Sequence, residues 1–151
     1  MRKALRKNDV KDLNDKVFSV IGVKDFFSKK DFVEVDDSFV FQKGEAFFFF
    51  CEGKPVPVLK KLVDNTFSLK KVVVDMGAVK FVVGGADIMR PGIVSFDEVS
   101  KNDFVVIVDV NNKKPLAVGL TLFSSNELKD LSSGKVIRNL HYVGDKIWNE
   151  S

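Results

Sequence analysis

The sequence has only one cysteine, one histidine, one tyrosine and one tryptophan among its 151 residues. Cys51 has no partner for an internal disulfide, which fits the reducing cytoplasm, where we expect this protein to be located. A closed zinc site of Cys and His ligands cannot be built from this set, and a Ser-His-Asp or Cys-His catalytic arrangement would have to include His141. No pair among the 21 Asp and Glu residues stands out by spacing for acid–base catalysis. The sequence therefore predicts neither an enzyme nor a cofactor or metal site.

Long hydrophobic runs are also absent. The longest cover residues 46–51 and 104–108, far short of the roughly 20 residues that a membrane-spanning helix needs. Residues 1–16 are basic but lack the apolar stretch of a signal peptide. Hydrophobic residues still make up 45% of the chain and 15 of them are Phe, enough for one or two small cores. We expect a soluble, folded protein that does not insert into membranes.

The positive charge is unevenly distributed. The formal net charge is +3; residues 1–71 hold 15 Lys and Arg against 11 Asp and Glu, whereas residues 72–151 hold 9 against 10. The basic residues of the first half form a cluster near the N-terminus and three Lys pairs: Arg2, Lys3, Arg6, Lys7, Lys29, Lys30, Lys60, Lys61, Lys70 and Lys71. Such runs are either solvated faces or contacts to a polyanion, and the sequence leaves both open for the N-terminal cluster.

The first half has the pattern of an α+β unit. Asn8 is a candidate N-cap, and apolar residues at three- and four-residue steps predict a short amphipathic helix over residues 9–17. Strand-like apolar runs with turn-forming residues between them follow at residues 31–35, 38–41 and 46–52.

After the third strand, two prolines in residues 53–57 predict a break, and residues 58–63 predict a short helix. The polar stretch at residues 64–71 predicts a boundary. We therefore expect two domains, at residues 1–70 and 71–151.

The second half is rich in predicted strands, which suggest a small barrel or sandwich closed on itself. The five runs are residues 72–74, 93–96, 104–109, 116–123 and 136–143. Asn111 and Asn112 suit a tight hairpin because Asn tolerates positive φ. Ser124 and Glu127 form a capping-box pattern, which predicts a brief helix that ends before Gly134.

Residues 75–93 form the most informative segment. Gly84 and Gly85, followed by the turn at Pro91 and Gly92, would let the backbone approach a ligand closely. The β-branched run just before the glycines favours a strand, although Asp75 could equally cap a short helix that ends at Gly84. The glycines match neither the Walker pattern nor the dinucleotide fingerprint, so a simple turn is an equally good interpretation.

Three isolated residues have ordinary structural interpretations beside functional ones. His141 lies on an alternating strand, where a lone histidine is more often packed or exposed than catalytic. Cys51 follows four phenylalanines and is expected to be a buried thiol that acts as a small hydrophobic residue. Trp148 could stack on a nucleobase, or close the barrel at the end of the last apolar element.

The motifs of the second half resemble the PUA domain, named for pseudouridine synthase and archaeosine transglycosylase. The resemblance rests on VDMGAV at 74–79, GGADIMRPGI at 84–93, FVVIVD at 104–109, PLAVG at 115–119 and HYVGDKIW at 141–148. The first half, with its basic helix and Phe-rich strands, is similar to the pre-PUA domain of stand-alone archaeal proteins. These in turn are similar to the malignant T-cell-amplified and ligatin proteins.

The resemblance implies an α/β pre-PUA domain followed by a pseudo-barrel of mixed strands flanked by short helices. It also implies RNA binding without catalysis, with tRNA or rRNA as the ligand, and an association with the small ribosomal subunit and a translation-factor partner. The residues that match the family's RNA-facing surface are Ala78, Lys80, Phe81, Gly84, Gly85, Asp87, Met89, Arg90 and Arg138.

Two departures bear on this expectation. The net charge of residues 72–151 is low for an RNA surface, so Lys80, Arg90 and Arg138, with Lys113 and Lys114, would have to gather on one face. Amides of the glycine loop would add hydrogen bonds to phosphate or base edges. Asn102 replaces a glycine that the family often has in that turn. The alternative function is an adaptor whose first half docks a translation factor or ribosomal protein, with weak RNA binding of its own.

Overall fold

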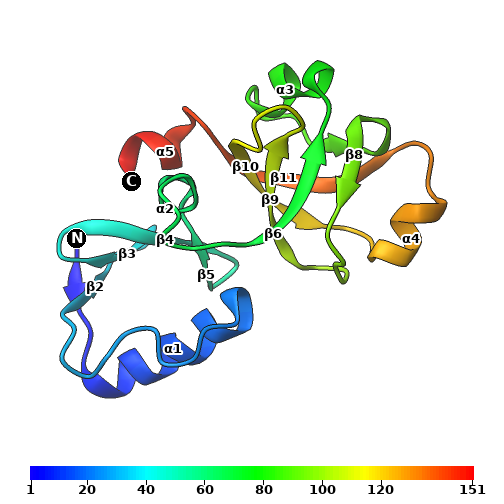
Figure 1. Ribbon diagram of the computed structural model, residues 1–151. Coiled ribbons are helices and arrows are strands. Elements are labelled where there is room, and N and C mark those ends of the chain that lie inside the picture. The colour runs from blue at the N-terminus through cyan, green and yellow to red at the C-terminus, as the bar shows by residue number, and fades with distance from the viewer.

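The computed structural model describes residues 1–151, and two β-sheets organise them (Figure 1). The first sheet is antiparallel throughout and its strands follow chain order. They are β1 (Lys3–Ala4), β2 (Val33–Val35), β3 (Phe39–Gln42), β4 (Glu45–Cys51) and β5 (Lys54–Pro57). The three strand-like runs of the first half are thus confirmed as β2, β3 and β4.

The second sheet has six strands in the order β7-β11-β10-β9-β6-β8. Their bounds are β6 (Lys70–Val74), β7 (Ile88–Met89), β8 (Ile93–Phe96), β9 (Phe104–Asp109), β10 (Pro115–Thr121) and β11 (Lys135–Tyr142). The pair β6–β9 is parallel and the other pairs are antiparallel. The sheet curls into a half-barrel of mixed strands (Figure 1). All five predicted runs form strands, and the α+β class is confirmed.

Short helices flank the sheets. They are α1 (Lys7–Ile21), α2 (Leu59–Val63), α3 (Met76–Val82), the 3-10 turn η1 (Arg90–Gly92), α4 (Ser125–Asp130) and α5 (Lys146–Glu150). The capping box that begins α4 is present, with Ser124 accepting from the Glu127 N–H and the Glu127 carboxylate accepting in return. None of these helices combines the length and apolar character needed to cross a membrane.

Helix α1 is longer than the sequence pattern indicated, and Asn8 is not its N-cap. The helix begins at Lys7, because the Arg6 backbone N–H donates to the Asp9 carboxylate at 3.3 Å and closes the first turn. It continues to Ile21 and ends where Gly22 adopts φ +73°.

The break predicted after the third strand is present, because β4 ends at Cys51 and a turn at Glu52 and Gly53 follows, but the two prolines lie in a further strand. Lys54–Pro57 form β5, which pairs only with β4 and is therefore an edge strand. Alternate residues of a strand direct their N–H groups to the same side of the strand. Proline has no N–H, so Pro55 and Pro57 both lack a donor on the same side of β5. An edge strand tolerates this loss on its outer side.

The structure also refines the sequence predictions for two loops and one helix. In the β9–β10 turn, Lys113 has positive φ (54°), and Asn111 and Asn112 do not. Asn102 does adopt positive φ (68°), so it reproduces the backbone conformation that glycine favours there. Of the two alternatives for the segment before Gly84, the helix is the correct one.

The two halves share a hydrophobic core. One buried cluster combines residues of α1 and the first sheet with Val73, Val106, Val108 and Val118 of the second sheet. A second cluster lies beneath α3 and includes Val82, on the other face of the same sheet. The chain passes from one sheet to the other between α2 and β6, where the boundary was expected, and the division into two domains stays a prediction.

Candidate nucleic-acid interface

Helix α3 forms one wall of the largest concave feature near the glycine loop. Asp75 caps the helix, because its Oδ1 accepts from the Ala78 N–H at 2.9 Å. Buried Val82 anchors the helix on the sheet. The opposite wall is β7 and η1, and the groove between them measures about 740 Å³. A Cβ on Gly92 would lie 3.1 Å from the Ala78 Cβ, so glycine allows the two walls to approach at one end.

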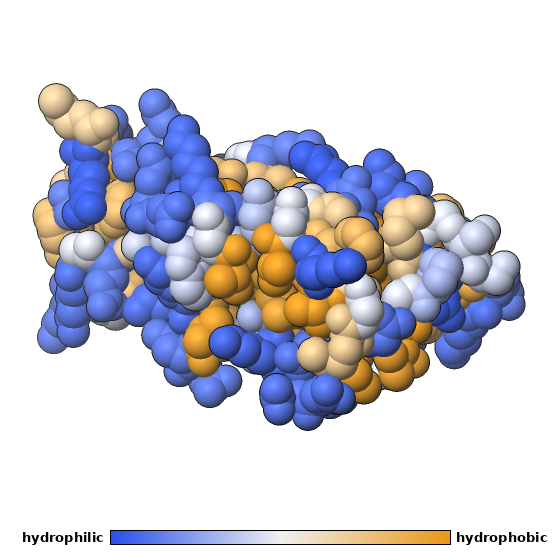
Figure 2. All heavy atoms as spheres, turned by 90° about the horizontal axis from the view of Figure 1, so that it is seen from above, coloured by the Kyte–Doolittle hydropathy of each residue, from blue (hydrophilic) through white to orange (hydrophobic).

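The groove exposes apolar side chains to solvent. Phe81 on α3 is 59% exposed and Met89 on β7 is 50% exposed, and both line the groove together with half-buried Ala78. Exposed Lys80 places its Nζ 5.1 Å from the centre of the Phe81 ring. Figure 2 views the face on which α3 lies and shows hydrophobic residues in its middle with hydrophilic residues around them. The structure thus brings Ala78, Lys80, Phe81 and Met89 together.

The amides of the glycine loop are already used within the fold. The Gly84 and Ala86 N–H groups donate to the Phe81 carbonyl at 3.2 and 3.0 Å, and the Gly85 N–H donates to the Val82 carbonyl at 3.0 Å. These bonds close the last turn of α3. The loop amides are therefore not free to bind phosphate, contrary to the expectation from sequence.

Gly85 has a structural reason to be glycine. Its φ is +94°, and a Cβ at this position would lie 2.9 Å from Cε1 of Tyr142. The Tyr142 ring on β11 thus packs directly on the loop. Gly84 is tight as well, since its Cβ would lie 3.2 Å from the Lys80 carbonyl oxygen.

Arg90 and Asp87, two charged residues predicted to face RNA, form hydrogen bonds within the fold. Arg90 Nε donates to the carbonyl of Leu128 at the end of α4 at 2.8 Å, and its guanidinium lies 5.7 Å from the Phe96 ring centre. Asp87 lines the groove, yet its Oδ1 accepts from the Asn139 N–H at 2.8 Å and its Oδ2 lies 3.5 Å from Lys135 Nζ.

Arg138 is exposed but lies away from the glycine loop. Its Nη1 is 3.9 Å from the Glu52 carboxylate at the β4–β5 turn of the first half. Neighbouring Ile137 packs in the cluster beneath α3, and adjacent strand residues point to opposite faces. Lys80, Arg90 and Arg138 therefore do not form the single basic face that sequence reasoning required.

The sequence interpretation missed Asn139. Its side-chain amide donates to the carbonyls of Val82 and Ala86, both at 3.0 Å. With the bond from its backbone to Asp87, this residue ties the end of α3 and the loop to β11. Its Oδ1 is buried without a hydrogen-bond partner. The available signal was a polar amide inside the strand sequence KVIRNLHY, where apolar and β-branched residues are favoured.

The isolated residues are packed into the fold. His141 is fully buried, and burial lowers its pKa below the usual 6.5 even though Asp145 opposes this effect. Cys51 is half-buried, not fully buried as expected, and burial raises its pKa. Trp148 on α5 packs against the core shared by the two halves, with Lys60 Nζ 5.3 Å from its ring centre. No group of three or more His, Cys, Asp and Glu side chains is placed to hold a metal ion.

The PUA domain model matches residues 70–143, which include α3, the glycine loop and β11. The chain is 42% identical to an uncharacterized protein of Methanocaldococcus jannaschii, across 96% of this chain and 93% of that protein. It is 36% identical to translation machinery-associated protein 20 of Schizosaccharomyces pombe across 64% of this chain, but spans only 56% of that protein's length.

The fold agrees with these sequence matches over both halves. The crystal structure of a hypothetical protein from Pyrococcus horikoshii superposes with a TM-score of 0.84 at 30% identity and covers 99% of each chain. The similarity thus includes the first sheet and α1 as well as the half-barrel. On sequence and fold together, this chain belongs to the family of PUA-domain proteins.

Proposed function

We propose that this protein binds RNA without catalysis and acts in translation, and that the groove between α3 and β7 is its main RNA contact. The observation that carries the proposal is the pair of exposed side chains on opposite walls, Phe81 and Met89, in a groove that Lys80 and Lys135 flank. The PUA match and the fungal relative's name support the RNA and translation parts respectively.

The chemistry of the groove favours unpaired nucleotides over the backbone of a duplex. A flat apolar ring such as Phe81 can stack on any base, whereas phosphate oxygens need donors. The loop amides and Arg90 Nε already have partners, so few donors remain for phosphates. We therefore expect the groove to take one or two splayed bases of a structured RNA, while Lys80 contacts the adjoining phosphate. The RNA would be a tRNA or the rRNA of the small ribosomal subunit.

A protein ligand is the second candidate for the same groove. The apolar walls that could hold a base could equally hold an apolar side chain of a translation factor or ribosomal protein. The observation in its favour is that Arg90 and Arg138 are engaged elsewhere, which leaves this face without a continuous basic track.

Binding of labelled tRNA and of a small-subunit rRNA fragment by Phe81→Ala tests the proposal. Loss of one stacking contact should weaken binding by about 1 to 3 kcal/mol. Lys80→Ala should flatten the plot of log affinity against log salt by roughly 0.7 for a single-stranded contact. Val94→Ala is the matched control, because Val94 is 55% exposed on β8 and does not line the groove.

The two candidates give different results. If Phe81→Ala and Val94→Ala bind both RNAs as tightly as the unmodified chain, the groove is not the RNA contact. If the unmodified chain binds neither RNA, the RNA proposal fails and the adaptor function takes its place.

A further inference from the structure

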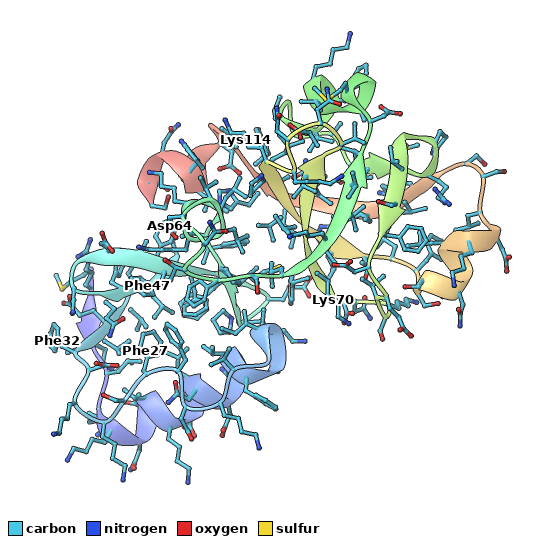
Figure 3. All side chains as sticks on the ribbon, in the orientation of Figure 1. Phe27, Phe32, Phe47, Asp64, Lys70 and Lys114 are labelled. Carbon is cyan, nitrogen blue, oxygen red and sulfur yellow. The ribbon has the colours of Figure 1, made fainter.

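The first half exposes two aromatic rings, Phe18 and Phe32, and Phe32 is the more exposed of the two. Phe32, just before β2, is 63% exposed, whereas Phe27 in the preceding loop is buried at 2% exposure. Figure 3 shows Phe27 among the side chains between α1 and the sheet and Phe32 at the outer end of this half. A single exposed apolar residue is common on protein surfaces, so the case for a function rests on what surrounds Phe32.

The backbone beside Phe32 is held in a closed turn. The Asp31 N–H donates to the Ser28 carbonyl at 3.1 Å, the Ser28 N–H donates to the Asp31 carboxylate at 2.8 Å, and the Lys30 N–H donates to Ser28 Oγ at 3.2 Å. Three bonds across four residues present Phe32 on a rigid support. A ligand would therefore lose little free energy in ordering this surface.

Strand pairing brings the N-terminal basic cluster to the same place. Ala4 pairs with Glu34, and the Leu5 N–H donates to the Val33 carbonyl at 2.9 Å, so the next step along the two strands sets Arg6 beside Phe32. We call this region the Phe32 surface; its exposed members are Arg6, Lys7, Lys29, Lys30 and Phe32.

Acidic residues nearby offset part of this charge. The Asp9 carboxylate is engaged by the Arg6 backbone and lies 3.5 Å from Arg6 Nε. The Asp31 carboxylate is bound inside its own turn. Only half-buried Glu34 on β2 remains without such a bond. The surface thus combines one rigid aromatic ring with four basic residues against three acidic ones.

We propose that the Phe32 surface is a second RNA contact, at which one base of a single-stranded segment stacks on Phe32 while the surrounding Lys and Arg residues contact its phosphates. A single ring amid cations suits a base and its backbone, because stacking needs one flat face and phosphates need positive charge. A protein segment would bury only one apolar side chain here and gain little. The inference rests on RNA being the ligand of this protein.

A fluorescent reporter tests the stacking directly. In a Trp148→Phe background, Phe32→Trp places the only tryptophan on the surface, and we expect a 12-residue oligouridine to quench its emission. An RNA duplex of the same length should quench it less. Phe18→Trp is the matched control, since Phe18 is an exposed ring (44%) beside Lys24 but outside the surface. Its emission should not change.

Affinity measurements on the otherwise unmodified chain make the test independent of the Trp148 substitution. Phe32→Ala should weaken oligouridine binding about 5- to 150-fold, the range that corresponds to one stacked base. Replacing Lys29 and Lys30 by Ala should reduce the salt slope by roughly 1.4, for two phosphate contacts on a single strand.

The outcomes separate this inference from the main proposal. If Phe81→Ala weakens RNA binding but Phe32→Ala and the Phe32→Trp reporter show no response, the second contact is overturned and the groove stands. If the unmodified chain does not bind RNA at all, both proposals fail. A Phe18→Trp reporter that is quenched as strongly as Phe32→Trp also overturns the inference, because the quenching is then not specific to this surface.

Discussion

The imidazole Nε2 of His141 accepts a hydrogen bond from the backbone N–H of Leu59 at 3.0 Å. Leu59 is the first residue of α2, whose N–H has no partner inside the helix. His141 lies on β11, so a side chain of the second half caps a helix of the first half. The other ring nitrogen, Nδ1, lies 2.9 Å from the Asp145 carboxylate. This arrangement fits a neutral ring that donates from Nδ1.

Protonation of His141 should destabilise the fold. A proton on Nε2 would face the Leu59 N–H and break the bond. Burial disfavours the charged ring and, with Lys60 nearby, lowers the pKa in the folded state, while Asp145 opposes this. The unfolded chain therefore takes up the proton first, near pH 6.5. Stability should be full above pH 6.5 and fall as the pH drops through the folded pKa, by up to about 1.4 kcal/mol per pH unit.

Urea unfolding at several pH values between 5 and 8, with His141→Gln as the comparison, measures this effect. The variant should be less stable at pH 8 but lose less stability on acidification than the unmodified chain. The same loss in both proteins would assign the pH dependence to other groups.

Arg90→Ala should lower stability, although the family resemblance placed Arg90 on the RNA-facing surface. The substitution removes the bond from Nε to the Leu128 carbonyl and the contact with Phe96. Hydrogen bonds to charged groups contribute about 1.5 to 3 kcal/mol, and we expect the free energy of unfolding to fall by about that amount. Thermal and urea denaturation test this, with Lys80→Ala as the exposed control. An unchanged midpoint for Arg90→Ala would show that the bond contributes nothing.

Gly85→Ala should cost more stability than Gly134→Ala. Both glycines have φ near +90°, so both substitutions incur the cost of a positive φ, about 1 to 2 kcal/mol. The Gly134 site has nothing within 4 Å of the added Cβ, whereas at Gly85 the Cβ would lie 2.9 Å from Tyr142. The difference between the two variants in urea unfolding measures the clash alone. Equal losses would mean that the Tyr142 ring moves aside at no cost.

Much of the fold could be predicted from the sequence because local residue patterns determine it. Alternating apolar runs identified the main strands, and Ser124 with Glu127 identified α4. The exceptions depend on tertiary pairing. The two prolines of β5 are acceptable only because nothing pairs with its outer edge, and sequence alone cannot show which strand lies at an edge.

The candidate site was predicted less well than the fold, for the same reason. The motifs located the glycine loop and α3, but the partner of each polar group comes from distant segments. Arg90 meets Leu128, and Asp87 meets Asn139, across more than 35 residues of chain in each case. Spacing in the sequence does not reveal which charges such contacts neutralise.

The two predicted domains should unfold together. Val73, Val106, Val108 and Val118 of the second half belong to the core of the first, so separation would expose them to water. We expect far-UV circular dichroism and Trp148 fluorescence to report one coincident urea transition. Protease should also cut slowly within residues 64–71. Two separate transitions would show that the halves fold independently.

Asn139→Ala should loosen the glycine loop more than it disturbs the rest of the fold. The side-chain amide donates to both the Val82 and the Ala86 carbonyls, and the variant removes both bonds. The Val82 carbonyl keeps the bond from the Gly85 N–H, and the exposed Ala86 carbonyl can bind water instead. A neutral hydrogen bond contributes about 0.5 to 1.5 kcal/mol, so the cost should be modest and confined to the loop. The backbone bond from residue 139 to Asp87 is retained, so β11 itself should keep its register.

Hydrogen exchange distinguishes local from global loosening in this variant. The Gly84, Gly85 and Ala86 amides should exchange faster in Asn139→Ala than in the unmodified chain. The exchange rates of the β9 and β10 amides should change only as much as the change in global stability requires. RNA affinity should fall as well, because Phe81 lies on the helix that the loop terminates. Asn149→Ala is the control, since Asn149 makes a single side-chain bond, to Gly144, far along the chain from the loop. Equal exchange of the loop amides in the two variants would refute the assigned role of Asn139.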